Sequence, residues 1–183
     1  VFTHTLDIDG NGYLIQGFGQ WKHRFTDRLS GVAGLHYQYA SLGDDQSLEP
    51  RLSFKWEVND KHALSLGGGF YSKTQPRFIY FKEQLVDTIT NTTIMPNTNL
   101  DMTRNKQVVL GYDLRFLPNH RLKLEAYYQY MHHVPVEEQE SYLSLINYGS
   151  SFSAYEYGAL VNEGKGFNYG IEFTLERFLS EGF

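Results

Sequence analysis

The sequence contains no cysteine and only 5 prolines among its 183 residues. Without thiols, disulfide bonds and thiolate metal sites are excluded. No run of about 18 apolar residues occurs, which excludes a membrane-spanning helix, and no signal peptide is recognisable at the N-terminus. Basic residues are few, since 16 Lys and Arg stand against 21 Asp and Glu, and the net charge of -5 argues against a nucleic-acid-binding protein.

Aromatic residues and glycine, by contrast, are abundant. The chain has 14 Tyr, 13 Phe and 17 Gly, and aromatics make up 16% of it. Aromatic side chains suit the pleated surface of a sheet, and glycine marks bends or close backbone approaches. This composition favours a protein built from β-strands.

Apolar and polar residues alternate with a period of two, which is typical of strands with one apolar and one polar face. The alternation is clearest at residues 50–58, where Leu52 and Trp56 alternate with Arg51 and Lys55. The same pattern predicts strands over residues 106–116, 121–130 and 166–176, and in weaker form over residues 12–25, 31–40 and 62–71. Most of these segments reach the roughly 9–11 residues that a tilted strand needs to cross a bilayer.

The connections between the predicted strands alternate in length. Short polar turns are predicted at residues 26–28, 59–61, 118–120 and 180–182, and longer links at residues 41–49, 72–105 and 132–165. Outer-membrane barrels combine tight periplasmic turns with extended extracellular loops. We therefore predict an all-β fold of antiparallel up-and-down hairpins, with about seven long strands, that forms an incomplete segment of a large transmembrane β-barrel.

Three stretches carry a family resemblance: residues 48–54 (LEPRLSF), residues 59–66 (NDKHALSL) and residues 162–172 (NEGKGFNYGIE). They resemble the C-terminal part of the barrel of TonB-dependent outer-membrane receptors, particularly the Bacteroidota type. The resemblance implies a Gram-negative outer membrane, a barrel of about 22 strands with a plug domain in its lumen, and uptake of a scarce small nutrient driven by the TonB complex. It implies no cofactor and no enzymatic activity.

Residues 1–183 are then expected to be a single partial barrel unit without its plug. An odd number of strands does not close an ordinary bacterial barrel. Such a piece exposes two strand edges and an apolar face that would otherwise contact outer-membrane lipid, so the isolated chain is expected to self-associate.

Ligand recognition is expected from aromatic and cationic residues of the two longest links. The candidates are Arg77, Phe78, Tyr80, Tyr142, Tyr148, Tyr155 and Tyr157. His132 and His133 belong to the same loop mouth, where a metal complex or haem would be sought first. Because adjacent residues of a strand point to opposite faces, the two imidazoles are not expected to converge on one ion. The inward-facing charges of the strands are expected to contact a plug or water.

A calcium site is the weakest of the candidates. Asp7, Asp9 and Asn11 match the front half of an EF-hand loop, but its twelfth position is Phe18, which supplies no carboxylate. A solvated turn is the preferred interpretation. No catalytic motif is present, and no nucleic-acid partner is expected.

Two other classes remain open at this point. Similar barrel walls support outer-membrane enzymes and adhesins, in which the loops catalyse a reaction or bind a host. A soluble β-sandwich that binds carbohydrate would instead use its loop tyrosines to stack on sugars.

Overall fold

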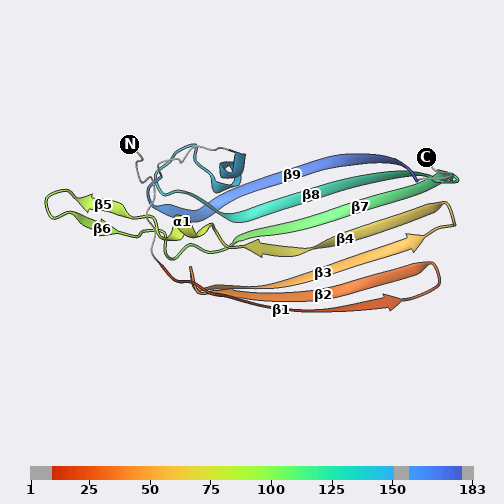
Figure 1. Cartoon of the computed structure of the whole chain (residues 1–183), viewed down its shortest axis with the longest axis horizontal. Coiled ribbons are helices and arrows are strands. Elements are labelled where there is room, and N and C mark those ends of the chain that lie inside the picture. The colour runs from red at the N-terminus through yellow and green to blue at the C-terminus, as the bar shows by residue number, and fades with distance from the viewer. Residues whose placement is uncertain (1–9, 151–156, 179–183) are drawn as a thin grey trace.

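Seven antiparallel strands form one sheet in the order β1-β2-β3-β4-β7-β8-β9 (Figure 1). The computed structural model describes residues 10–150 and 157–178, except for the side chains of residues 148–150. The strands are β1 (Leu14–Arg24), β2 (Leu29–Ala40), β3 (Asp45–Glu57), β4 (His62–Lys73), β7 (Thr103–Leu117), β8 (His120–Glu137) and β9 (Leu160–Arg177). Each strand pairs with its neighbours in the sheet, so the topology is a simple up-and-down meander.

The remaining elements lie in the two longest connections. Helix α1 (Arg77–Tyr80) and the small hairpin of β5 (Gln84–Asp87) and β6 (Thr92–Ile94) lie between β4 and β7, and the 3-10 helix η1 (Leu145–Ser150) lies between β8 and β9. The hairpin projects away from the sheet (Figure 1). No helix in the described ranges is both long and apolar enough to cross a membrane.

The all-β fold class and all seven predicted strands are confirmed, but several strand ends were placed too early or too late. The links run over residues 74–102 and 138–159, because β4, β7, β8 and β9 continue beyond the predicted boundaries. The predicted long link at residues 41–49 is wrong. The link is a tight turn of residues 41–44, and the polar stretch that follows already belongs to β3.

Gly43 explains how this turn closes. Its φ is +78°, and a Cβ at this position would collide with the backbone oxygen of Leu100. Only glycine combines a left-handed backbone with so close an approach. Polar residues that face inward can belong to a strand. The cluster of polar residues at 45–49 therefore does not indicate a loop.

Successive connections lie at opposite ends of the sheet. The links of residues 25–28, 58–61 and 118–119 lie at one end, here called the turn end, and residues 41–44, 74–102 and 138–159 lie at the other, the loop end (Figure 1). The fourth predicted short turn, residues 180–182, lies outside the described residues.

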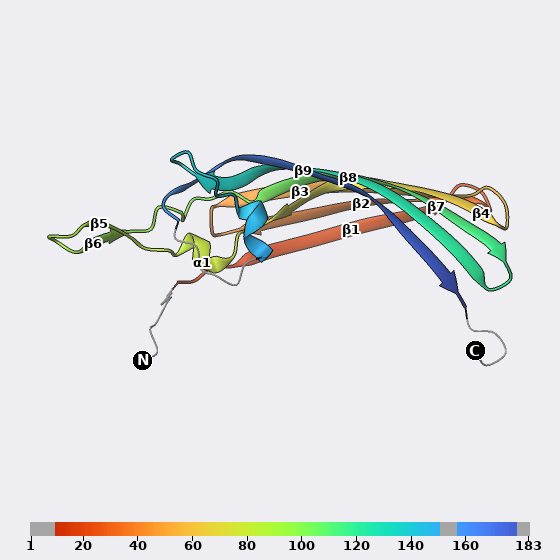
Figure 2. The same ribbon diagram turned by 90° about the horizontal axis from the view of Figure 1, so that it is seen from above.

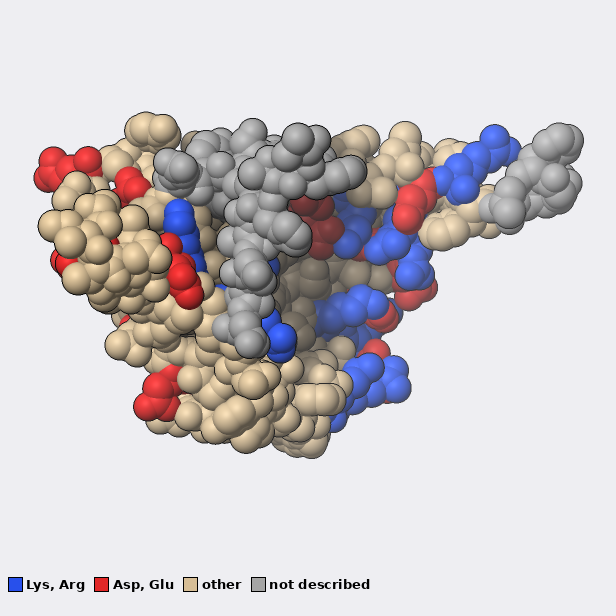
Figure 3. Space-filling model, turned by 60° about the vertical axis from the view of Figure 1, so that its left-hand side comes forward, with Lys and Arg blue, Asp and Glu red and all other residues tan. Residues whose placement is uncertain are grey.

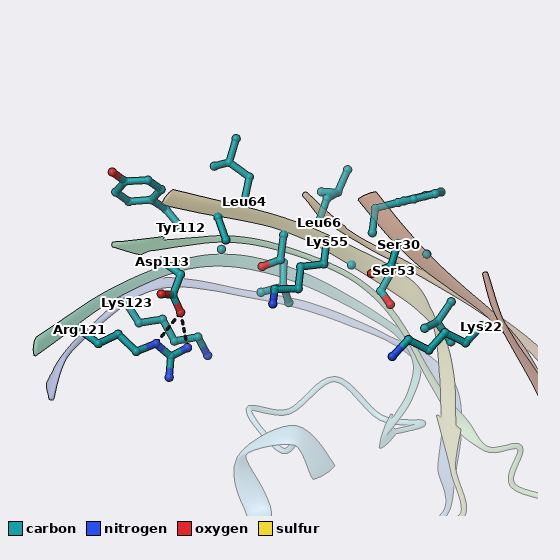
Figure 4. A pocket seen from close by; sticks show the side chains of 18 residues that line it. Lys22, Ser30, Ser53, Lys55, Leu64, Leu66, Tyr112, Asp113, Arg121 and Lys123 are labelled. Atoms are coloured by element: carbon teal, nitrogen blue, oxygen red, sulfur yellow. Dashed lines mark hydrogen bonds and ion pairs between the residues drawn. The ribbon is translucent and has the colours of Figure 1, made fainter. Parts of the chain in front are cut away.

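The sheet is curved, and η1 lies on its concave side, while the β5–β6 hairpin extends beyond the loop end (Figure 2). Apolar side chains occupy the convex face: Leu64, Leu66 and Tyr112 point away from the concave side, where Lys55 and Asp113 lie (Figure 4). Large apolar residues of the convex face are strongly exposed, up to 79% at Ile171. An aqueous solvent would penalise so much apolar surface, at roughly 25 cal/mol per Å², whereas lipid would cover it.

Candidate ligand-facing surface

Charged and polar side chains gather in the hollow of the concave side (Figure 3). A depression of about 440 Å³ over β1 to β4, β7 and β8 is lined there by Lys22, Ser53, Lys55, Asp113 and Lys123 (Figure 4). These residues reach one face because alternate positions of each strand point the same way. The sheet therefore has one apolar and one charged face over its whole width.

Ion pairs neutralise many of the charges on this face. Arg121 donates from Nε to Asp113 Oδ2 at 2.5 Å and also pairs with Glu176 at 3.2 Å, which joins β7, β8 and β9. Lys55 lies 2.8 Å from Glu57 on the same strand. The Arg121 pairs link adjacent strands, and all of these pairs leave a hydrated wall suited to contact with another polar surface.

A second polar cluster lies nearer the loop end and centres on the carboxylate of Glu49, which is only 2% exposed. Its members, called the Glu49 cluster below, are His36, Gln38, Ser47, Glu49, Arg51 and Ser72. Glu49 Oε1 accepts hydrogen bonds from the Ser72 backbone N–H and the Gln38 amide, both at 2.8 Å. Glu49 Oε2 accepts from Arg51 at 2.7 Å and lies 3.1 Å from His36 Nδ1.

The Glu49 cluster replaces missing strand pairing. The β3–β4 ladder joins Arg51–Glu57 to Ala63–Gly69 and ends there, although both strands continue toward the loop end. Beyond it, the backbone N–H of Ser72 donates to Glu49 and the backbone carbonyl of Ser72 accepts from Gln38 at 2.9 Å. Since buried backbone groups need partners, these two side chains close a seam that the ladder leaves open.

The two longest loops share a small hydrophobic core at the loop end. It consists of Ile79, Tyr80, Leu100, Tyr157 and Leu160. The Tyr80 ring is fully buried, burial raises the pKa of its phenol, and its oxygen accepts a hydrogen bond from the Gln75 backbone N–H at 3.2 Å. The phenol thus stays protonated in a packed environment.

Polar contacts reinforce this loop core. Asn97 accepts from the Leu160 backbone N–H at 2.8 Å, and Asn162 accepts from the Asp101 backbone N–H at 2.9 Å. The ammonium group of Lys82 lies 3.8 Å from the centre of the Tyr157 ring, a cation–π contact. The link of residues 74–102 is therefore joined to Tyr157 and to the start of β9.

The structure distributes the predicted ligand-binding residues over three environments. Phe78, Tyr80 and Tyr157 come together in or against the loop core, and Tyr157 is only 7% exposed. Arg77 is exposed on α1, and Tyr142 stands alone with 92% of its surface exposed. Tyr155 and the side chain of Tyr148 lie outside the described residues.

The two histidines contact each other and do not point to opposite faces as regular alternation predicts. His133 has a φ of +55° at an irregularity of the β8–β9 pairing, so the alternation of side chains breaks at this residue. The His132 and His133 Nδ1 atoms lie 2.6 Å apart, a hydrogen bond in which one ring donates to the other. A bulge of this kind re-aims a side chain, and the sequence gives no local sign of it.

Within the part of the chain that the structure describes, neither candidate metal site gains a further ligand. Among the described residues, no group of three or more His, Cys, Asp or Glu side chains is placed to hold a metal ion. Asn11 is exposed near the start of β1, and Asp7 and Asp9 lie outside the described residues.

The Glu49 cluster is not predicted from the sequence, because the polar character of residues 41–49 favours a link there. A signal was nevertheless present: Ser47, Glu49 and Arg51 continue, toward the N-terminus, the polar positions of the strand at residues 50–58. Extending the period-two pattern through the polar stretch would have placed Glu49 on the inward face.

Comparisons with known proteins agree on one architecture. A family model described as "TonB dependent receptor-like, beta-barrel" matches residues 3–181. No curated protein sequence matches the chain. Among solved structures, the siderophore receptor PirA from Acinetobacter baumannii superimposes with a TM-score of 0.66 at 15% identity, over 90% of this chain. The match spans 25% of the length of that receptor, so the likeness concerns the fold of one part of it.

Proposed function

Because this chain belongs to the TonB-dependent receptor-like β-barrel family, we propose that it forms part of the wall of an outer-membrane receptor for TonB-dependent nutrient uptake. The strands form the wall and the loops at the loop end contribute to recognition of a small external ligand. Residues 1–183 act as one partial barrel unit, and its plug domain and the TonB complex are partners of the complete receptor. The role is transport rather than catalysis.

One observation carries the proposal: along the seven-stranded sheet, the convex face carries a broad band of exposed apolar side chains and the concave face gathers the charged ones. A soluble sandwich also has two faces, but its apolar faces pack against each other inside. Here the apolar face is the exposed one, which suits a lipid environment and supports a Gram-negative outer-membrane location. A Bacteroidota-type receptor is the finer form of the same proposal.

Among the ligand-binding candidates, Arg77 and Tyr142 are the accessible ones. In our proposal they contact ligand directly, whereas Phe78, Tyr80 and Tyr157 shape the loops that carry them. His132 and His133 stand at the edge of this region. Exposed aromatic and guanidinium groups provide stacking and hydrogen bonding to a polar nutrient.

Uptake by the complete receptor tests the proposal. The gene would be deleted in its host, and growth would be compared on a series of limiting nutrient sources. On a source that the deletion strain cannot use, the wild-type receptor should restore growth only when TonB is present. Arg77→Ala with Tyr142→Ala should weaken uptake, while Lys61→Ala at the turn end should not. Restoration that is independent of TonB would contradict the proposal, as would a protein whose migration in detergent is not heat-modifiable.

The isolated chain provides a second test. With both sheet edges and the convex face uncovered, the 183-residue chain should associate in detergent-free buffer. Light scattering measures this. A folded, stable monomer would refute the assignment of the convex face to lipid.

A further inference from the structure

The convex face carries a sharp boundary between apolar and cationic residues near the loop end. Outward positions in four neighbouring strands, β4, β7, β8 and β9, lie in register in rows across the sheet. From the row of His62 and Leu114 to the row of Val108 and Tyr128, all of these positions are free of Lys, Arg, Asp and Glu. Beyond this apolar band, charged residues on the convex face therefore first appear at one level along the strands, toward the loop end.

That height also carries aromatic rings. The next row consists of Phe70, Lys106, Tyr130 and Phe167. The row after it includes His132 and Lys165, which are paired across β8 and β9. The Lys106 ammonium lies 5.8 Å from the centre of the Phe70 ring, so its stem runs along the aromatic surface.

Between these side chains lies a hollow of about 520 Å³. It is lined by Lys106, Tyr130, His132, His133, Asn162, Glu163 and Lys165. The imidazole of His132 is held in place by stacking on Tyr130, with ring centres 5.9 Å apart, and by its hydrogen bond to His133. Arg104 is near in sequence but is taken up by Asp45, 2.7 Å away. The two lysines outweigh the one carboxylate, that of Glu163.

We infer that this hollow, called the headgroup site below, binds the phosphate of a lipid headgroup in the leaflet that faces the loop end. The inference rests on the proposed function, which places the convex face in a membrane. Aromatic rings mark the level of the headgroups, and lysines just beyond them lie where anionic lipid phosphates are found. Tyr130 and Phe167 contact the upper acyl chains, Lys106 and Lys165 neutralise the phosphate, and His132 supplies a ring nitrogen.

The test uses the complete receptor in detergent and native mass spectrometry with two probes that differ only in the phosphate, phosphatidic acid and the matching diacylglycerol. The wild type should retain phosphatidic acid and not diacylglycerol. The double substitution Lys106→Gln and Lys165→Gln removes two positive charges at the level of the headgroups. It should weaken retention of phosphatidic acid about 10- to 30-fold. Glu163→Gln should strengthen it, because it removes the one negative charge from the hollow.

Matched controls separate this site from general charge effects. Lys55→Gln with Lys123→Gln removes two charges from the concave face and should leave retention unchanged. An equal concentration of inorganic phosphate should not displace the lipid, because the free ion lacks the acyl contacts. Equal retention by the wild type and the double variant of the headgroup site would overturn the inference, and so would displacement of the lipid by inorganic phosphate.

Heat-modifiable migration of the same samples keeps the two proposals apart. If the receptor is heat-modifiable but its lipid retention is unchanged when Lys106 and Lys165 are replaced, the headgroup site alone is refuted. A protein without heat-modifiable migration would refute the outer-membrane receptor itself. The stronger retention of phosphatidic acid expected for Glu163→Gln is measured on a separate variant. This test therefore holds even if the double variant does not fold.

Discussion

Replacing Glu49 by alanine should open the outer part of the β3–β4 seam without unfolding the sheet. Glu49 is the acceptor for the backbone N–H of Ser72 and for the amide of Gln38, and both donors lie in a region that water barely reaches. Below the seam, the ladder between Arg51–Glu57 and Ala63–Gly69 does not depend on Glu49. The damage should therefore stay local.

The magnitude follows from the groups left without a partner. A buried donor that loses its acceptor costs about 1–3 kcal/mol. The Ser72 N–H is the donor that is left so, whereas the Gln38 amide keeps the Ser72 carbonyl and hydroxyl as acceptors, and the free energy of local opening should fall by about 1–3 kcal/mol. Arg51 contributes little to this sum, because 42% of its side chain is exposed and water replaces the lost ion pair. At 1.4 kcal/mol for each factor of ten, amide exchange at Ser72 should be about 5- to 100-fold faster.

Hydrogen–deuterium exchange of the complete receptor in detergent measures this directly. Peptides covering residues 68–76 should exchange faster in Glu49→Ala than in the wild type, and peptides covering residues 108–116 should not change. In Glu49→Gln, exchange at residues 68–76 should be slower than in Glu49→Ala and faster than in the wild type, because the glutamine keeps one oxygen acceptor. Glu57→Ala serves as the control, because its exposed carboxylate contacts only Lys55. If Glu49→Ala and Glu57→Ala gave the same exchange at residues 68–76, the seam argument would be refuted.

Three further predictions concern the faces, the turn and the loop core. Leu66→Arg on the convex face should destabilise the complete receptor by about 2–4 kcal/mol in folding titrations into lipid, whereas Ser53→Arg on the concave face should have little effect. Gly43→Ala should destabilise the fold by more than about 1 kcal/mol and lower the temperature of the heat-modifiability transition, because its backbone is left-handed and a Cβ would collide with Leu100. Tyr80→Phe removes the acceptor of one buried N–H and should cost about 1–2 kcal/mol, seen as faster proteolysis of the loops, and unchanged cleavage would refute the buried role of the phenol.

The wall of this fold was predictable because its signal is physical and repeated. Each strand must put one set of side chains toward lipid and the other toward water, so the period of two survives in nearly every strand. Strand ends were less predictable. At residues 45–49 and 132–137 the strands continue beyond the apolar band. There the two faces no longer differ in polarity, so the pattern that reveals a strand is lost.

The candidate sites depended on contacts that sequence does not encode locally. The convergence of His132 and His133 results from a positive φ at His133. The burial of Tyr80 and Tyr157 results from two loops, far apart in sequence, that pack on each other. Tyrosines in long links resembled ligand contacts, but a loop that holds its shape needs a core of its own, and large aromatic residues supply the most area for it.

The shared loop core has a kinetic consequence for entry into the barrel. Because the Lys82 ammonium lies on the Tyr157 ring and the Asn97 amide donates to the carbonyl of Gly158 at 3.3 Å, neither loop moves at these residues while the other stays. Packed cores have discrete arrangements rather than a continuum of them. We therefore expect the mouth to rearrange as an all-or-none event with a single relaxation time, so that probes attached to either loop report the same rate.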